Sequence, residues 1–456
     1  MIDHDEPKTG LLTRGHARPL EKAEDAMVKR FAGMAPFLGA LVSVALVLAA
    51  GVSERGLGAV ADWLFDSFTR PVALLALIQA AYTAMQSLLW LRYRPFVAPA
   101  NAVWPKVSVI IPAFNEGPMV ERSIRSVAAA DYPRELLEII VVDDGSRDDT
   151  LFHMQHLRRE FPSLVRLMRF PGNKGKRAAL EAGFRAASGE VFVTIDSDSE
   201  IDPSTVREMV APFLVDDMIG AVAGRVAVLN RDSMISRMLE VQYALAFDFG
   251  RAAQSVYRTV ACCPGALSSF RARLILPHLE DWTHQTFLGR PVGHGEDQAL
   301  TNIVLRQGYD TVYQSTATVN TLAPTKYWPM TRMFVRWDRS YIVEGFTFAK
   351  FMFTRYRKKN RVLPIVAFFA SNIRLVFAAW GIVQLPSAFD QNLGTMGWAL
   401  ASMAVGALFS AAYYLRIEKS FRFVYGLAYA LFSFFLLQWI LPWALVTVRD
   451  ERWGTR

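Results

Sequence analysis

Residues 191–200, with the sequence VFVTIDSDSE, place a short apolar run directly before a group of acidic residues. The apolar part predicts a buried strand, and Asp196, Asp198 and Glu200 follow it. Carboxylates at the end of a buried strand are costly unless a positive group neutralises them. Two carboxylates separated by one residue suit Mg²⁺ or Mn²⁺, which proteins hold with one or two carboxylates plus substrate phosphate oxygens. The alternative is a solvated corner between strand and loop, and this stretch alone leaves both open.

The segment from Trp104 to about Asp310 alternates short apolar runs with helical patterns. The apolar runs lie at 107–116, 137–146, 164–170, 191–198 and 219–229. Between the first two runs, Val120, Ile124 and Val127 recur at helical spacing. The alternation predicts an α/β layer fold with a mainly parallel sheet, and ligands of such sheets bind beyond the carboxyl ends of the strands.

Polar residues gather where these predicted strands end. The clusters are Asn115 and Glu116; Asp143, Asp144 and Gly145; Asn173, Lys174, Gly175 and Lys176; and Asp196, Ser197 and Asp198. Because the carboxyl ends of parallel strands meet at one edge, we expect one site. It offers acidic residues for a cation, Lys174, Lys176 and Arg177 for phosphate, and Asp143 or Glu116 as acceptors for a base or ribose. The sequence therefore predicts a pocket for a metal ion and a nucleoside diphosphate.

The motifs of two other nucleotide-binding folds are missing from the sequence. It contains no Gly-x-x-x-x-Gly-Lys-Ser/Thr loop, and no Gly-x-Gly-x-x-Gly follows the first predicted strand. A P-loop ATPase and a dinucleotide-binding fold are therefore disfavoured.

Long apolar runs flank this segment on both sides. The 456 residues are 52% hydrophobic with a net charge of +8, and apolar content this high predicts membrane spans. Uncharged or nearly uncharged runs lie at 35–52, 71–90, 362–383, 396–415 and 423–448. Basic residues cluster beside them, which favours the cytoplasmic loops of a membrane protein over a nucleic-acid-binding surface.

These patterns divide the chain into six parts. We predict a cytoplasmic segment at 1–34, two transmembrane helices within 35–90, the α/β domain at 104–326, interfacial helices at 327–361, three transmembrane helices within 362–448, and a tail at 449–456. The distribution of Lys and Arg places the α/β domain on the cytoplasmic side of the inner (plasma) membrane.

Four of the short motifs together resemble inverting family-2 glycosyltransferases with the GT-A fold. They are PAFNE (112–116), DDGS (143–146), NKGKRAAL (173–180) and DSDS (196–199). Segments 237–271, 281–302 and 327–337 narrow the resemblance to processive members: hyaluronan synthase, chitin synthase and the nodulation chitin-oligosaccharide synthase. The resemblance covers about 104–345. It implies a Rossmann-like GT-A catalytic domain, inserted between transmembrane helices, that transfers sugar from a UDP-sugar to a growing β-linked polysaccharide and extrudes the product.

The resemblance also implies roles for individual residues. Asp297, beside Glu296, would be the general base of catalysis, although an acid at this helix start also favours the helix dipole. Donor binding would fall to Pro112, Asn115, Glu116, Asp143, Asp144, Lys174, Lys176, Asp196 and Arg336. Asp198 and Asp196 would hold Mg²⁺ or Mn²⁺. The acceptor would meet Cys263, Pro264, Gly265 and Trp337, although tight packing explains the small residues equally well.

Three positions depart from the family pattern. Met333 stands where the family has Gln in Gln-x-x-Arg-Trp, so we expect one donor-side hydrogen bond to be missing. Gln298 replaces the usual basic residue after Gly-Glu-Asp, and the acceptor motif reads Cys-Pro-Gly-Ala in place of a Ser-Gly-Pro-like order.

Other interpretations of the sequence remain open at this stage. One is a non-processive transferase that glycosylates a polyprenyl phosphate or another lipid, and another is a transporter or structural membrane protein. Arg374 lies within a predicted span near Ser371 and Asn372, which indicates either a polar polysaccharide channel or a polar pair inside the helix bundle. The implied partners are a UDP-sugar, a polysaccharide acceptor and the lipid bilayer, with no nucleic acid. The donor sugar, the linkage and the oligomeric state are not set by these patterns.

Overall fold

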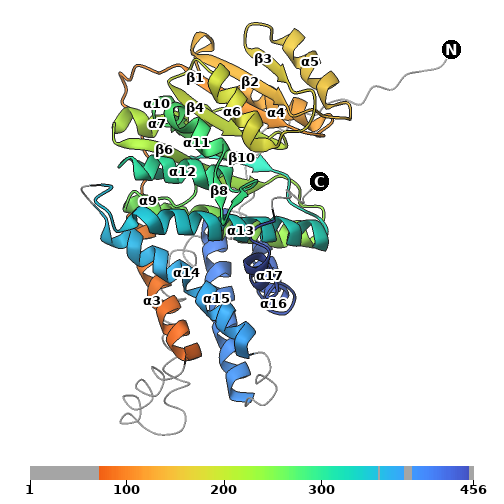
Figure 1. The fold of residues 1–456 in the computed structure, drawn as a ribbon. Coiled ribbons are helices and arrows are strands. Elements are labelled where there is room, and N and C mark those ends of the chain that lie inside the picture. Colours follow the sequence, from red (N-terminus) through yellow and green to blue (C-terminus); the bar gives the residue numbers. More distant parts are fainter. Residues whose placement is uncertain (1–70, 358–359, 385–392, 451–456) are drawn as a thin grey trace, which may run out of the picture.

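The computed structural model describes residues 71–357, 360–384 and 393–450 (Figure 1). An eight-stranded mixed sheet, in the order β3-β2-β1-β4-β7-β6-β10-β5, organises the upper part of the molecule. Its strands are β1 (Val107–Ala113), β2 (Leu137–Asp143), β3 (Val165–Arg169), β4 (Val191–Ile195), β5 (Ser199–Ile201), β6 (Ile219–Val228), β7 (Leu267–Arg271) and β10 (Asp310–Thr321). All five predicted strand runs are confirmed as β1, β2, β3, β4 and β6.

Alternation along β1 supplies the core on both faces of the sheet. Val109 and Ile111 belong to the apolar cluster on one face, where Ile124 of α4 (Met119–Ala128) packs. Ile110 belongs to the cluster on the other face, with Phe184 of α6 (Lys176–Ala186). Successive side chains of a strand point to opposite faces, so a strand covered on both sides is apolar throughout. The α/β layer prediction is confirmed, with α5 (Thr150–Glu160) and α7 (Thr205–Val215) completing the nearby helices.

The sheet is less parallel than the sequence indicated. The strands β1 to β4 pair in parallel, and so do β6 and β10, but β7 runs antiparallel to both β4 and β6. Sequence analysis missed β7 because its centre is polar. Ser268 shares a hydrogen bond with Thr194 at 2.7 Å, and Ser269 donates to the Met209 carbonyl at 3.0 Å, so these buried hydroxyls are satisfied.

The segments that follow β6 are mostly helical. They include α8 (Met234–Ala244), a π-helical turn at Leu245–Phe249, α9 (Gly250–Val256), α10 (Ala272–Ile275), α11 (Leu279–Thr283), the hairpin of β8 (Thr286–Phe287) and β9 (Arg290–Pro291), and α12 (Glu296–Arg306). Helix α13 (Tyr327–Met352) then crosses the base of the sheet domain, with α12 packed against it (Figure 1).

Further helices extend away from the sheet on the far side of α13 (Figure 1). They are α3 (Pro71–Arg92), α14 (Val362–Gln384), α15 (Leu393–Glu418), α16 (Val424–Leu436) and α17 (Ile440–Val446). Within the described ranges, no single helix passes both the length and the hydropathy test for crossing a membrane. The bent pair Phe421–Leu436 and Ile440–Val446, which meet at 49°, passes it together on length and composition.

Several predictions concern residues outside this description. The span predicted at 35–52, the segment 1–34 and residues 451–456 of the tail lie outside the described residues. The backbone of Arg374 lies in α14, but its side chain is also outside the description.

Candidate active site

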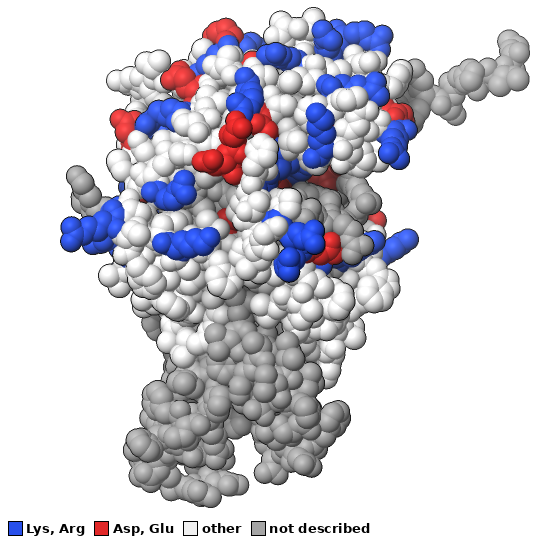
Figure 2. Space-filling view, viewed as in Figure 1, with Lys and Arg blue, Asp and Glu red and all other residues white. Residues whose placement is uncertain are grey.

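A cavity of about 1070 Å³ opens between the carboxyl-end loops of the sheet and the helices α12 and α13. On the face shown in Figure 2, Lys and Arg side chains are spread widely, and several Asp and Glu gather near its middle. Fourteen of the predicted site residues line this cavity: Pro112, Asn115, Glu116, Asp144, Lys174, Lys176, Asp196, Asp198, Pro264, Gly265, Glu296, Asp297, Arg336 and Trp337. The four polar clusters therefore meet at one edge, with α12 and α13 closing the other side.

Two predicted site residues, Asp143 and Cys263, lie behind the cavity lining. The carboxylate of Asp143 is fully buried and accepts a hydrogen bond from the Ser146 amide at 2.8 Å, which holds the loop after β2. Cys263 is buried in the core, and its neighbour Cys262 reaches the cavity instead. Along this loop, adjacent side chains point to opposite sides, one into the core and one into the cavity. The spacing of sequence motifs does not determine which of the two faces the cavity.

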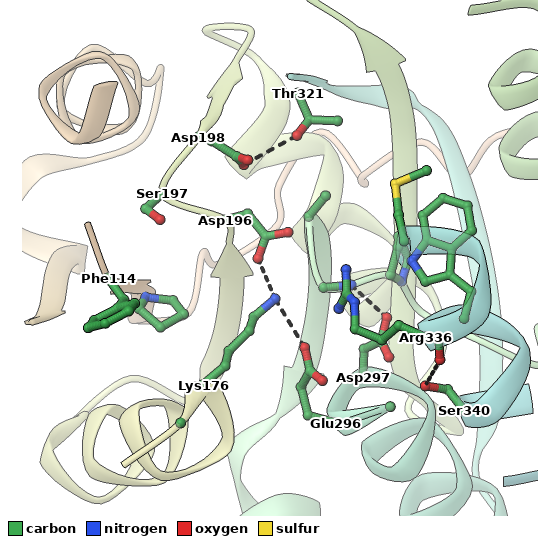
Figure 3. Close-up of a pocket in the computed structure, with 18 of the residues that line it drawn as sticks. Phe114, Lys176, Asp196, Ser197, Asp198, Glu296, Asp297, Thr321, Arg336 and Ser340 are labelled. Carbon is green, nitrogen blue, oxygen red and sulfur yellow. Dashed lines mark hydrogen bonds and ion pairs between the residues drawn. The ribbon is translucent and has the colours of Figure 1, made fainter. Parts of the chain in front are cut away.

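Lys176 connects the two sides of the cavity (Figure 3). Its ammonium lies 2.5 Å from Asp196 Oδ1, at the end of β4, and 3.0 Å from Glu296 Oε1, at the start of α12. Burial lowers the pKa of Lys176, but the two carboxylates outweigh it and raise the pKa above its usual range. Gly265 makes room for this contact, since a Cβ there would lie 2.9 Å from the Lys176 ammonium. Lys176 is thus a permanent cation between the strand side and the helix side.

Asp297 is held at the first turn of α12 by backbone amides. Its Oδ2 accepts from the Gly265 amide at 2.9 Å, and its Oδ1 accepts from the Gln298 amide at 2.8 Å. Gly295 precedes the helix with φ of 71°, and a Cβ at that position would lie 2.9 Å from the Ser340 Cβ on α13. Glycine at this position therefore allows both the left-handed turn and the close approach of the two helices.

Glu296 and Asp297 have opposite electrostatic environments. Burial would raise the pKa of Glu296, but Lys176 and then Arg336 outweigh it, so this pKa is lowered. For Asp297, burial and then the charge of Glu296 raise the pKa above the usual carboxyl range. Neighbouring carboxyl groups with separated pKa values suit different tasks, a fixed anion and a proton acceptor.

The acidic pair after β4 offers oxygen ligands for a hard cation. Asp196 and Asp198 both line the cavity, and Asp198 Oδ1 accepts from the Thr321 hydroxyl at 3.3 Å. Across the residues described, no group of three or more His, Cys, Asp or Glu is arranged to hold a metal. The donor set fits Mg²⁺ or Mn²⁺, because such ions take one or two carboxylates and complete their shell with phosphate oxygens and water.

The loops at the opposite end of the cavity are held by side-chain-to-backbone hydrogen bonds. The Asp144 carboxylate accepts from the amides of Lys174 at 2.7 Å and Gly175 at 2.9 Å. The Asn115 side chain accepts from the Arg147 amide at 2.9 Å, and Asn115 itself adopts φ of 55°. These bonds turn the loop ends so that their polar atoms face the cavity.

An aromatic wall forms on the α13 side. The Trp337 ring lies 6.0 Å from Tyr243, 5.7 Å from Phe247 and 5.5 Å from Phe334, measured between ring centroids. The Tyr243 hydroxyl donates to the Met333 sulfur at 3.5 Å. Sequence analysis missed Tyr243 and Phe247, whose only signal was an aromatic pair four residues apart on a helical pattern.

Comparison with known proteins extends over most of the chain. Residues 108–276 match the family model described as Glycosyl transferase family 2. An N-acetylglucosaminyltransferase of Azorhizobium caulinodans is 32% identical over 354 residues, which is 77% of this chain and 87% of the relative. A hyaluronan synthase of Streptococcus pyogenes serotype M1 is 31% identical over 404 residues, which is 86% of this chain and 92% of the relative.

A solved structure supports the same architecture. The mannosyltransferase PcManGT from Pyrobaculum calidifontis, in complex with GDP-Man and Mn²⁺, has a TM-score of 0.50 and 23% identity over 80% of this chain and 99% of that chain. The fold and the comparisons together identify this chain as a glycosyltransferase with a GT-A-like mixed α/β domain. The chain belongs to glycosyltransferase family 2 and is related to hyaluronan synthases and rhizobial N-acetylglucosaminyltransferases. The predictions of enzyme class and family are confirmed.

The pKa separation leads to a prediction for Glu296→Gln. A base with a raised pKa loses activity as pH falls through that pKa, so Asp297 sets an acid limb above the usual carboxyl range. Removing the charge of Glu296 removes one cause of the raised pKa. We therefore expect the acid limb of kcat/KM, measured by nucleotide release, to move to lower pH. Glu280→Gln, at an exposed position of α11, is the control, and a limb that stays in place or moves to higher pH contradicts the assignment.

Proposed function

We propose that this cavity binds a UDP-sugar with Mg²⁺ or Mn²⁺ and transfers the sugar, with inversion, to the growing end of a β-linked polysaccharide that the chain also extrudes. The observation that carries the proposal is the Lys176 bridge. It joins Asp196, beside the predicted donor phosphates, to Glu296, which directly precedes the predicted base Asp297. Residues predicted for the donor and residues predicted for the acceptor line the same cavity, which supports the proposal.

The donor would lie along the sheet side of the cavity. Asp196 and Asp198 would hold the cation, which supplies charge stabilisation to the departing diphosphate. Lys174 and Arg336 would contact the same phosphates. The positive charge of Arg336 acts within the cavity, since it helps to lower the pKa of Glu296. Asn115, Glu116 and Asp144 line the end where a nucleoside would fit.

Asp297 would act on the acceptor hydroxyl. As that oxygen forms its bond to the anomeric carbon, its proton passes to the Asp297 carboxylate, and UDP leaves from the opposite face with the bonding electron pair. Attack from the opposite face converts an α-linked donor into a β-linked product. The amides of Gly265 and Gln298 hold the carboxylate in place, so its orientation is set before the substrate arrives.

The acceptor sugar would stack on Trp337, whose ring is in contact with Phe334, Tyr243 and Phe247. An aromatic face suits the apolar side of a pyranose ring. The name of one relative, a hyaluronan synthase, supports synthesis of a polysaccharide, and the name of the other, an N-acetylglucosaminyltransferase, supports transfer of a sugar. A lipid-linked acceptor, the other candidate, would give a short product of fixed size.

We further propose that the apolar runs at 35–52, 71–90, 362–383, 396–415 and 423–448 place the chain in the plasma membrane, with the α/β domain in the cytoplasm. The helices α3, α14 and α15, of 22, 23 and 26 residues, leave the sheet domain on one side, which supports this arrangement (Figure 1). By length alone such helices reach across the roughly 30 Å apolar core of a bilayer. Among the described residues, the bent pair Phe421–Leu436 and Ile440–Val446 is what meets length and hydropathy together.

The direct test of the proposal is UDP or GDP release from UDP-glucose, UDP-GlcNAc, UDP-glucuronate and GDP-mannose with each metal. We expect release from at least one UDP-sugar, and a loss of roughly 10²-fold or more in Asp198→Ala because one group that holds charge at the leaving phosphate is removed. Asp202→Ala, an exposed carboxylate four positions on, is the matched control. Wild-type release from Asp198→Ala would contradict the donor site, and release from GDP-mannose alone would contradict the UDP assignment.

A second prediction concerns the length of the polysaccharide product. Trp337→Ala should be nearly inactive because the acceptor ring loses its platform and with it the alignment on which the rate depends. Met333→Gln should retain activity and give product of the same or greater length, since a restored hydrogen bond is worth about 0.5–1.5 kcal/mol. UDP release together with product sizing tests both variants. Full-length polymer made by Trp337→Ala at the normal rate would place the acceptor site elsewhere.

A further inference from the structure

Behind the cavity lies a second buried polar group that the proposed reaction does not use. Its members are Arg177 on α6, Gln285 before β8, Asn302 on α12 and Glu344 on α13, and we call them the Arg177–Glu344 relay. None of the four lines the cavity. Arg177, Asn302 and Glu344 are 7%, 4% and 1% exposed, so their polar atoms depend on one another for hydrogen bonds.

The relay has a fixed hydrogen-bond direction. Arg177 donates to Gln285 Oε1 at 2.9 Å, and Gln285 Nε2 donates in turn to Glu344 Oε1 at 2.7 Å. Asn302 Nδ2 donates to Glu344 Oε2 at 2.8 Å and to the Glu344 carbonyl at 3.0 Å. Because the Gln285 oxygen is committed to Arg177, its amide cannot rotate to accept from another donor without breaking that bond. Glu344 must therefore accept on both carboxylate oxygens.

The relay joins the elements that carry the proposed catalytic groups. Arg177 directly follows Lys176, and it also donates to the carbonyls of Trp282 at 2.7 Å and His294 at 3.2 Å. The Trp282 indole donates to the Glu296 carbonyl at 3.2 Å, so the first turn of α12 is tied to the same segment. Helices α6, α12 and α13 are thus connected through one set of buried hydrogen bonds.

Spacing along α13 links the relay to the cavity. Arg336, Ser340 and Glu344 are each four residues apart and lie on one stripe of the helix. Ser340 faces the α12 start, where its hydroxyl lies 3.3 Å from His294 Nδ1 and its Cβ leaves no room for a side chain at Gly295. A slide of α13 along α12 by one residue would move Arg336 by about 1.5 Å.

We propose that Glu344 and Gln285 are positioning residues of the transferase. They hold α13 against α12 and α6, and so set the positions of Arg336 and Trp337 relative to Asp297 and Lys176. They contact neither the sugar nor the nucleotide. The inference rests on the proposed roles of Asp297 and Arg336. Errors of about 1 Å in such placements cost on the order of 10²-fold in rate, so the relay controls turnover from outside the cavity.

A swap of the two side chains tests the relay. Glu344→Gln replaces one of the two accepting oxygens by an amide NH₂, which then faces a partner that already donates. We expect kcat for nucleotide release to fall roughly 10- to 100-fold while KM for the donor changes by less than about threefold. Gln285→Glu alone places two carboxylates together and should also be slow. The double variant Gln285→Glu with Glu344→Gln restores every donor–acceptor pair and puts the charge beside Arg177. We expect it to recover kcat to within about threefold of the wild type.

The controls are measured in the same assay of nucleotide release. Glu181→Gln, which removes a carboxylate paired with Arg185 on α6, should leave kcat unchanged. The proposal is overturned if Glu344→Gln turns over at the wild-type rate, if the folded double variant is as slow as the single one, or if the single variants lose only thermal stability. Should Glu344→Gln fail to fold, Asn302→Ala removes one donor without a clash, and an unchanged kcat there is equally contradictory. A wild-type protein that releases nucleotide from none of the four donors contradicts the proposed function instead.

Discussion

Lys176 between Asp196 and Glu296 is the contact on which the arrangement of the site depends. A strand end and a helix start both bring carboxylates to the same place, and without a cation between them two negative charges would face each other across the cavity. Gly265 leaves room for the ammonium, and Arg177 anchors the next position of α6 behind the cavity. The NKGKR segment therefore both lines the pocket and connects the sheet to α12 and α13.

This cation also divides the work of the two neighbouring carboxyl groups. Glu296 faces Lys176 and Arg336, which lower its pKa, so it remains an anion over the range in which enzymes operate. Asp297 points toward Gly265, is less favoured as an anion, and has a raised pKa. One dipeptide at one helix start thereby provides a fixed counter-charge and a proton acceptor, because the two side chains leave the helix in different directions.

Much of the sheet and of the site could be predicted from the sequence, because parallel strands bring their carboxyl ends to one edge. Five apolar runs became strands, and the polar residues after them met at one edge because their carboxyl ends are neighbours. The remainder depends on contacts distant in sequence. Strand β7 is built on satisfied serines, Tyr243 and Phe247 reach the cavity through the end of α8 and a π-helical turn, and Glu344 acquires its surroundings only when α12 and α13 pack. Cys262 and not Cys263 lines the cavity because of the loop conformation, which residue type does not determine.

The central claim is that Lys176 joins Asp196 on the donor side to Glu296, which precedes the base, and a double-mutant cycle of Lys176 with Glu296 on kcat/KM for nucleotide release measures this contact. The variants are Lys176→Met, Glu296→Gln and their combination. If the bridge is the organising contact, removing Lys176 leaves Glu296 as an uncompensated charge, so adding Glu296→Gln to Lys176→Met should cost nothing further or restore part of the rate. We expect a coupling free energy of about 1 kcal/mol or more, and losses that add to within about 0.5 kcal/mol would contradict the account.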